Sequence, residues 1–360
     1  MFLRRVASKI IPKSIVLEYQ CSRFDRSKTI YNNRSFNDYL TEFYPLIVSK
    51  REAVDSGKVQ SDILRSFFKY GVRPDEYYLY NYIDIDNSER NSYLSQRSKD
   101  RLLIDYYGPK WGLLLSDLKD KYSFYKYVSP YFKRDVICVK NNEDFDAFES
   151  FLHNHSSVFA KQISGYCGLG ARVIDNSSHS RRPEDIFNEL LQDGEWILEE
   201  TIQQDSSLAQ FNPTSINTIR FPSFRHGNIV NPVFPCLRVG RYGSIVDNAG
   251  RGGVFVSVDK DSGIIVSDAF DERGNMFKTH PDSNICFKGF PIPKWNELLD
   301  LIVDAHLSLP SRHVYVAFDV ALSNKGWCIV EGNWGDFVLQ QVSLQRGLKK
   351  EFRNYLGSFV

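Results

Sequence analysis

Three side chains that could hold a metal ion lie near the end of the chain, on two segments that read as neighbouring strands. Asp319 lies on the first segment, Glu331 and Asn333 lie on the second, and Asn324-Lys325-Gly326 lies between them. A three-residue hairpin loop centred on Lys325 would place Asp319 opposite Glu331 on one face of a sheet, although a bulge could shift this register by one residue. Like charges placed opposite each other destabilise a hairpin unless a cation lies between them. Two carboxylates and a carbonyl oxygen suit Mg²⁺, so we expect a magnesium site here.

The alternation of side chains along the same hairpin predicts its buried face. With a period of two, the face away from the acids carries apolar residues, namely Val316, Phe318, Val320, Leu322, Cys328 and Val330. The alternative is that Asp319 and Glu331 are two solvated acids on a strand surface. A phosphate-loop candidate upstream favours the metal site.

That candidate is a glycine-rich loop between two strand-like segments. Gly165, Gly168 and Gly170 would let backbone amides approach an anion closely. Lys161, at the end of the first strand, supplies a cation for the same phosphates. The loop has no GK[ST] motif and leads into a strand, so it is neither a Walker loop nor a Rossmann fingerprint. A purely structural hairpin is the alternative.

Charged residues inside other strand-like segments are further candidates. Glu199 and Glu200 end a strand that leads into the second lobe. A hinge at this point can present backbone hydrogen-bonding groups to the edge of an adenine ring. The alternative is an exposed strand end. Arg220 and Arg238 lie in otherwise apolar strands, where an unpaired charge is unfavourable. Their planar forks suit phosphate or carboxylate, and a structural salt bridge is the alternative. Asn217 lies on the same strand as Arg220, with its side chain on the other face.

The elements that must position these residues alternate between strand and helix, and strands dominate after residue 213. The expected strands are 136–139, 158–162, 171–175, 196–200, 216–221, 233–239 and 254–258, and the expected helices are 35–48, 61–70, 142–152, 183–192 and 291–307. This order predicts the α+β class with two lobes. The tyrosines of the segment 77–82 could stack on a ligand, but packing is the more common use.

The composition narrows the functional classes. With 25% charged residues, 42% hydrophobic residues and a net charge of +1, the chain lacks the basic field of a nucleic-acid-binding protein. Six cysteines without a CxxC pair indicate buried free thiols in a reducing compartment, so we expect a cytoplasmic protein. No apolar stretch is long enough to be a transmembrane segment. Residues 1–13 form a basic amphipathic segment, for which peripheral membrane contact is weighed against a plain surface helix.

Taken in order, the motifs resemble those of ATP-grasp enzymes. The segments that carry this resemblance are Asp120-Lys121, Phe159-Ala160-Lys161 with its glycine loop, Leu198-Glu199-Glu200, Asp319 and Glu331-Gly332-Asn333. Within the ATP-grasp enzymes, the chain most resembles the sugar-transfer-associated ATP-grasp family, which belongs to bacterial surface-polysaccharide pathways. The segments that carry this narrower resemblance are SINTIR, LRVG, VDNAGRGG, His280-Pro281 and GFPIPKW. The resemblance covers residues 115 to 345. It departs from the family pattern at Gln162, where a proline is usual, and at Trp334-Gly335-Asp336, which replaces a proline-glycine pair.

The resemblance implies an ATP-grasp fold in which two α+β lobes hold ATP between them. It implies an N-lobe at 116–202 and a C-lobe with the metal site at 203–360. Residues 1–115 precede the resemblance, and their own sequence predicts a mostly helical, aromatic-rich region. The implied nucleotide contacts are Lys121, Lys161, Gly165, Gly168, Gly170, Glu199, Glu200, Ile202 and Asn217. The implied ligands of one or two Mg²⁺ ions are Asp319, Glu331 and Asn333, and the implied catalytic residues are Lys161, Arg220 and Arg238.

The implied activity is that of a carboxylate–amine ligase. A small-molecule or sugar-linked carboxylate would take the γ-phosphoryl group of ATP, and an amine would then displace phosphate from the acyl phosphate. One alternative is a phosphotransferase on the same scaffold with a hydroxyl acceptor. Another is a non-catalytic protein that binds carbohydrate or a partner through its aromatic N-terminal region.

Overall fold

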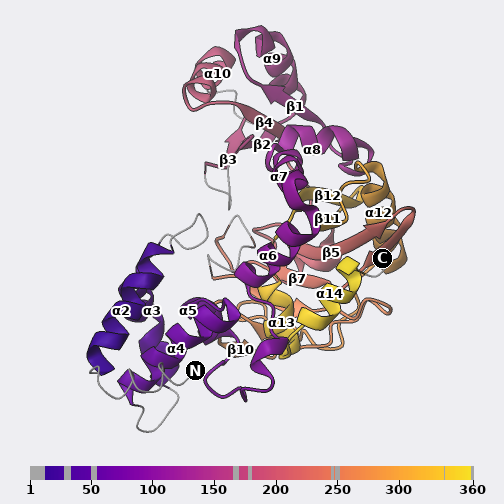
Figure 1. Cartoon of the computed structure of the whole chain (residues 1–360). Helices are drawn as coiled ribbons and strands as arrows, with labels where there is room; N and C mark the ends of the chain where they lie inside the picture. Colours follow the sequence, from indigo (N-terminus) through magenta and orange to yellow (C-terminus); the bar gives the residue numbers. More distant parts are fainter. Residues whose placement is uncertain are drawn as a thin grey trace. The chain divides into compact units, whose positions relative to one another are not determined.

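The structure is a computed structural model, and it divides the chain into two compact units (Figure 1). The described residues are 13–27, 34–49, 55–164, 170–176, 181–244, 247, 252–335 and 337–357, with only the backbone described for 13–15. One unit comprises 1–105, 272–275 and 336–354, and the other comprises 106–271, 276–335 and 355–360. Each unit is described on its own. The predicted lobe boundaries at 115/116 and 202/203 stay predictions.

The first unit is built from helices whose ends follow local sequence signals. Its main helices are α2 (Lys13–Arg26), α3 (Phe36–Val48), α4 (Ser56–Tyr70), α5 (Pro74–Leu79) and α13 (Val338–Leu344), and α6 (Gln96–Tyr107) lies mostly within it. Ser35 caps α3, because its hydroxyl accepts from the backbone N–H of Asp38 and the Asp38 carboxylate accepts from the N–H of Ser35. The predicted helix at 61–70 begins earlier, at Ser56, because Asp55 caps it.

The tyrosine cluster of the first unit serves packing. Tyr77, Tyr80 and Tyr82 are buried. The ring of Tyr82 contacts the rings of Tyr77 and Tyr80 and also those of Tyr70 and Tyr93. These rings fill a core, as the packing alternative for this segment proposed.

The second unit contains a four-stranded antiparallel sheet. Its strands are β1 (Val136–Val139), β2 (Ser157–Gln162), β3 (Arg172–Asp175) and β4 (Trp196–Glu200), in the spatial order β1-β4-β2-β3. The helices α9 (Phe145–Asn154) and α10 (Pro183–Gln192) pack on it and share its core (Figure 1). Pro183 begins α10 at the position that the sequence predicts. The predicted helix 142–152 divides into a 3₁₀ turn, Asn142–Asp144, and α9.

An eight-stranded sheet forms the rest of the second unit. Its order is β10-β9-β8-β7-β5-β11-β12, with β6 paired to β5. The strands are β5 (Thr218–His226), β6 (Ile229–Pro232), β7 (Cys236–Val239), β8 (Val254–Ser257), β9 (Ala269–Phe270), β10 (Met276–Phe277), β11 (Tyr315–Ser323) and β12 (Gly326–Asn333). The helices α7 (Trp111–Lys119), α8 (Lys121–Val128) and α12 (Trp295–Ser308) contribute to its core. Helices and antiparallel sheets together confirm the predicted α+β class.

Several predicted boundaries are shifted. β5 begins two residues later than predicted and β7 three residues later, after Pro235. α12 begins at Trp295, because Pro291 and Pro293 precede it and Lys294 has a left-handed backbone with φ of 53°.

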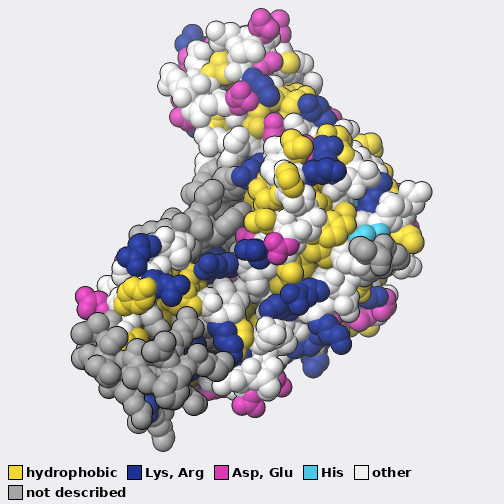
Figure 2. All heavy atoms as spheres, in the orientation of Figure 1, with side chains coloured by type: hydrophobic (Ala, Val, Ile, Leu, Met, Phe, Trp, Pro, Cys, Tyr) yellow, Lys and Arg dark blue, Asp and Glu magenta, His cyan; other side chains and the backbone are white. Residues whose placement is uncertain are grey.

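The cysteines only partly follow the expectation of buried thiols. Those in the described part of the chain are free: Cys236 and Cys328 are buried, Cys21 and Cys138 are half-buried, and Cys286 is exposed. Cys167 lies outside the described residues. None of the helices in the described ranges combines the length and apolar character needed to span a membrane. On the visible face, basic side chains are scattered among uncharged, apolar and acidic ones (Figure 2).

Candidate functional site

The β11–β12 hairpin places Asp319 opposite Glu331, as predicted, but by a different route. The turn has two residues, Asn324 and Lys325, because Ser323 pairs directly with Gly326. This register alone would not pair the two acids. A β-bulge between Asp319 and Val320 shifts the register by one residue and restores the pairing.

The two-residue turn corrects the prediction of the buried face. Val316, Phe318, Val320 and Leu322 of β11 lie in the core, but from β12 the core receives Trp327 and Ile329, not the predicted Cys328 and Val330. The shorter turn moves the strand by one residue, and a one-residue slip reverses the faces. Val330 lines a pocket instead.

Asp319 is the most enclosed acid of this site. Its side chain is 1% exposed, and it lies opposite Arg220 on β5. Arg220 binds it with both arms of the guanidinium: Nε donates to Oδ1 at 2.8 Å and Nη2 donates to Oδ2 at 2.7 Å. Arg238 donates to Oδ2 at 3.2 Å. Burial alone would raise the pKa of Asp319, but the two arginines lower it to about 2, so the carboxylate is charged.

Arg238 also contacts two residues that the sequence did not single out. Its guanidinium donates to Thr218 Oγ1 at 2.8 Å and to Asp247 Oδ1 at 3.3 Å. Asp247 in turn accepts from the Thr218 hydroxyl and, at 3.0 Å, from the Thr218 backbone N–H. Burial raises the pKa of Asp247 despite the nearby arginine. The available signal was that Asp247 lies in the segment VDNAGRGG, which contributes to the family resemblance.

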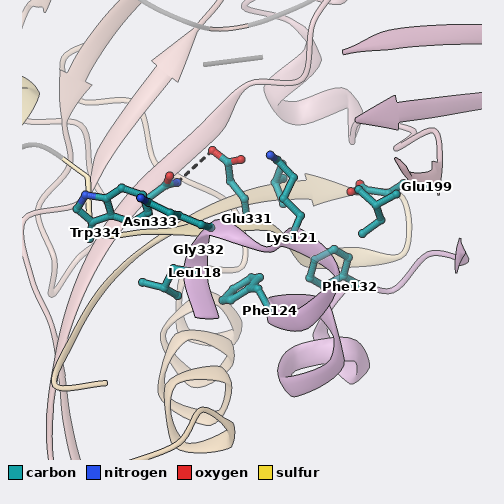
Figure 3. A pocket seen from close by; sticks show the side chains of 12 residues that line it. Leu118, Lys121, Phe124, Phe132, Glu199, Glu331, Gly332, Asn333 and Trp334 are labelled. Carbon is teal, nitrogen blue, oxygen red and sulfur yellow. Dashed lines mark hydrogen bonds between the residues drawn. The ribbon is translucent and has the colours of Figure 1, made fainter. Parts of the chain in front are cut away.

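Asn333 connects the two facing acids. Its amide nitrogen donates to Glu331 Oε1 at 3.1 Å (Figure 3). The same nitrogen donates to Asp319 Oδ2 at 3.3 Å. The structure therefore brings together the three predicted metal ligands. Rotation of the Asn333 amide by half a turn would turn its oxygen toward a cation bound between the acids. Each carboxylate oxygen has more than one lone pair, so it can bind an arginine and a metal ion at the same time. This donor set fits a hard divalent cation such as Mg²⁺.

Lys121 extends toward the same acids from the first turn of α8. Asp120 caps that helix by accepting from the Ser123 N–H at 2.8 Å. Lys121 Nζ donates to the backbone carbonyl of Gln162 at 3.1 Å. Burial lowers the pKa of Lys121, and Glu331 opposes this shift. In Figure 3 the Lys121 side chain lies between those of Glu331 and Glu199.

Lys161 is held by a buried ion network. Its Nζ lies 2.9 Å from Glu199 Oε1. Glu199 Oε2 accepts from Arg134 Nε at 2.9 Å and Nη2 at 2.6 Å, so both carboxylate oxygens of Glu199 bind cations. Burial alone would raise the pKa of Glu199, but Arg134 and Lys161 hold it below its usual value. Arg134 was missed because an arginine in Lys133-Arg134-Asp135 reads as surface charge.

The other predicted nucleotide contacts lie in several settings. Glu200 pairs with Lys325 at 2.8 Å, and Ile202 is half-buried. Asn217 is fully buried, and its amide donates to the carbonyls of Leu208 at 2.9 Å and of Asn212 at 3.2 Å. Its amide thus holds a loop, and it is absent from the residues lining the pocket described below.

The predicted glycine loop lies partly outside the described residues. Gly165 and Gly168 lie outside the described residues. Gly170 has φ of +77° and approaches the Gln162 side chain, so a side chain at this position would be strained. His280 is buried and holds its own loop: Nε2 contacts the Gly240 carbonyl at 2.9 Å, and Nδ1 accepts from the Ser283 N–H at 3.2 Å.

A pocket lies beside Lys121, Glu199 and the Glu331–Asn333 segment of β12 (Figure 3). Its lining residues are Leu118, Lys119, Lys121, Phe124, Phe132, Ile197, Glu199, Val330, Glu331, Gly332, Asn333 and Trp334. Leu118, Phe124 and Phe132 form an apolar side, while Lys121, Glu331 and Asn333 bring charge and hydrogen-bonding groups. Such a pocket can bind a ligand whose flat ring packs on the apolar side and whose charged groups contact the polar side.

Comparison with known proteins identifies a family. The family model described as "Sugar-transfer associated ATP-grasp" matches residues 116–355, about two thirds of the chain. No curated protein matches the sequence.

The solved structures to which the chain shows some similarity include amino acid ligases. A D-alanine-D-alanine ligase from Coxiella burnetii has a TM-score of 0.36 at 9% identity, over 61% of this chain and 48% of that one. An L-amino acid ligase from Bacillus licheniformis has a TM-score of 0.40 at 8% identity, over 68% and 48%. The ATP-grasp ligase PsnB, complexed with a minimal precursor, has a TM-score of 0.43 at 12% identity, over 70% and 62%. The chain thus matches only part of each protein's length, and likeness at this level carries no argument about activity.

Proposed function

Because the chain belongs to the sugar-transfer-associated ATP-grasp family, we propose that it is an ATP-dependent ligase that joins a carboxylate to an amine. The observation that carries this proposal is the pairing of Asp319 with Glu331 in the β11–β12 hairpin, with Asn333 bonded to both. Asp319 is buried and Glu331 is half-buried. Two carboxylates that face each other in this way are unfavourable alone and become favourable beside cations. The arginines and Lys121 supply fixed cations, and the remaining oxygens suit Mg²⁺.

The chemistry needs no covalent nucleophile from the protein. A carboxylate oxygen of the substrate attacks the γ-phosphorus of ATP, and ADP leaves. The amine nitrogen then attacks the acyl carbon, the C–O bond to phosphate breaks, and the amine loses a proton as the amide forms. Phosphate is the second product. Positioning and charge stabilisation supply the catalysis in such a reaction.

The chain's own residues divide this work. Lys121 and Lys161 bind phosphate oxygens, and the amides of the glycine loop add to that contact. Arg220 and Arg238 stabilise the negative charge of the acyl phosphate and of its tetrahedral adduct. Asp319, Glu331 and Asn333 would hold one or two Mg²⁺ ions, which when bound supply neutralising charge to the phosphates.

The substrates and the cellular pathway that we propose rest on the family alone. We propose a small-molecule or sugar-linked carboxylate and an amine, used in the cytoplasm during synthesis of a bacterial surface polysaccharide. The family description links these proteins to sugar transfer, which favours this setting. A phosphotransferase would use the same ATP site and differ in its acceptor.

The test is ADP release measured with Mg²⁺ across a panel of carboxylates, amines and hydroxyl compounds. We expect release that requires both a carboxylate and an amine, that is lost in Glu331→Gln, and that yields a hydroxamate when hydroxylamine replaces the amine. Glu149→Gln removes an exposed glutamate on α9 and is the matched control, with unchanged activity expected. ADP release that needs only a hydroxyl compound would indicate a phosphotransferase. Failure of the wild-type protein to bind ATP would refute the proposal.

A further inference from the structure

Arg134 lies just before β1 and uses its whole guanidinium group inside the second unit. Nε and Nη2 donate to Glu199, while Nη1 donates to the carbonyls of Phe132 at 3.0 Å and of Ile329 at 2.7 Å. Its side chain is 3% exposed, and the guanidinium lies 4.3 Å from the centre of the Phe132 ring. A buried arginine with this many partners is held in one orientation.

One end of this contact leads to Lys161. Glu199 lies on β4, and the β2–β4 pairing places Lys161 diagonally across from it. The carboxylate is shared, with Oε2 on Arg134 and Oε1 on Lys161. A cation fixed on one oxygen of Glu199 therefore orients the other oxygen, and with it the Lys161 ammonium.

The other end leads to the bulge of β12. Ile329 is paired with Val320, whereas Glu331 is paired with Asp319, so Val330 is the extra residue between them. β12 is the last strand in the order of the eight-stranded sheet, and Arg134 satisfies the Ile329 carbonyl at its bulge. The bulge sets the register that makes the two acids face each other.

We propose that Arg134 is a positioning residue that couples the phosphate-binding lysine to the metal-binding strand. Through Glu199 it sets the position of Lys161, and through the Ile329 carbonyl it fixes the bulge that orients Glu331. This inference rests on the proposed function, since it assigns Lys161 to nucleotide and Glu331 to metal. It predicts that the energetic link between ATP and Mg²⁺ binding passes through a residue that touches neither ligand.

The test is the affinity for ATP, measured by calorimetry with and without Mg²⁺, in the wild-type protein and in Arg134→Lys. A lysine keeps one charge beside Glu199, but its single ammonium cannot replace the fork that spans Glu199 and Ile329. Because this lysine keeps a cation on Glu199, Glu199 should still hold Lys161, so we expect ATP binding without Mg²⁺ to change little. The gain in affinity on adding Mg²⁺ should fall about 10- to 100-fold, the usual loss when a residue supporting a metal ligand is changed.

Two further variants separate positioning from general stability. Glu331→Gln removes the proposed end point, so adding Arg134→Lys to it should produce no further loss of the Mg²⁺ effect. Arg182→Lys changes an exposed arginine that precedes α10 and pairs with Asp185, and it should leave both affinities unchanged.

Several outcomes would overturn the inference. An unchanged Mg²⁺ effect in Arg134→Lys would do so, and so would equal loss of ATP affinity with and without Mg²⁺. If Arg134→Lys does not fold, Arg134→Met is used, because Glu199 then still pairs with Lys161; loss of folding in both variants would assign Arg134 a structural role alone. A wild-type protein that binds no ATP would instead refute the proposed function.

Discussion

Gly332 separates the two proposed metal ligands on β12, and replacing it with alanine should disturb the site by a purely steric route. Its backbone does not have the positive φ that favours glycine, so alanine can adopt its conformation. A Cβ at this position would lie 2.3, 2.6 and 3.0 Å from three ring carbons of Phe124. Phe124 is buried, and its ring packs against the rings of Phe132 and Phe318. Ring and strand must therefore separate.

The size of the effect follows from these distances. Non-bonded carbons normally lie about 3.5–4.0 Å apart, so the contact must open by more than ~1 Å. Overpacking of this kind destabilises a folded protein by about 1–3 kcal/mol. Phe124 and Lys121 lie three residues apart on α8, on one side of the helix. A displacement of ~1 Å at a reacting group can slow turnover on the order of 10²-fold.

The assay pairs urea unfolding with Mg²⁺-dependent ADP formation. We expect Gly332→Ala to lose both stability and turnover by these amounts. Gly112→Ala is the matched control, because a Cβ there meets no atom within 4 Å and the residue lies in helix α7. Its stability should be unchanged or raised by about 0.5–1 kcal/mol, the usual gain of alanine over glycine in a helix.

A second substitution tests the cause. Replacing Phe124 with leucine in the Gly332→Ala protein shortens the side chain under the new methyl group, so stability should partly return. Wild-type stability and turnover in Gly332→Ala would refute the reasoning. Failure of Phe124→Leu to restore any stability would show that the clash is not the cause.

Three further predictions concern ionisable side chains that are buried or half-buried. Burial lowers the pKa of His306 to about 3, so as pH falls below the unfolded value of 6.5 the unfolded chain takes up the proton first. The contribution of neutral His306 to the free energy of unfolding is complete above pH 6.5 and is lost toward pH 3, at up to about 1.4 kcal/mol per pH unit. When urea unfolding is measured from pH 7 to 4, the free energy of unfolding should therefore fall less steeply with pH in His306→Gln than in the wild-type protein. An equal slope in the two proteins would contradict this. Asp319→Asn leaves Arg220 and Arg238 without their shared carboxylate and should lower the free energy of unfolding by about 3–5 kcal/mol, whereas a loss below 1 kcal/mol would mean that solvent screens the arginines. Burial lowers the pKa of Lys121, so ATP affinity should be complete below that pKa and fall as pH rises through it; Lys121→Arg should move this alkaline loss to higher pH, and an unmoved profile would exclude Lys121 as the titrating group.

The sequence by itself determined the elements whose signals are local. Ser35 with Asp38 began α3, and Pro183 began α10, because caps and proline act within one helical turn. The strand 196–200 was also predicted with its observed bounds. The order of the motifs identified the family that the family model then matched over residues 116–355.

The tertiary structure decided the register and the long-range partners. The pairing of Asp319 with Glu331 was predicted from a three-residue loop, yet it depends on a two-residue turn and a bulge at Val330. Strand alternation gives the period of the faces but not the place of an extra residue, which packing selects.

The ion partners were beyond reach for a related reason. Arg134 and Glu199 are 65 residues apart, and Arg220 and Asp319 are 99 residues apart. Nothing in the local sequence of Arg134 distinguishes it from a surface arginine. A buried ion pair forms only when folding brings strands from different parts of the chain together. The residue types therefore indicated the chemistry, whereas the packing of the sheets determined which residues pair.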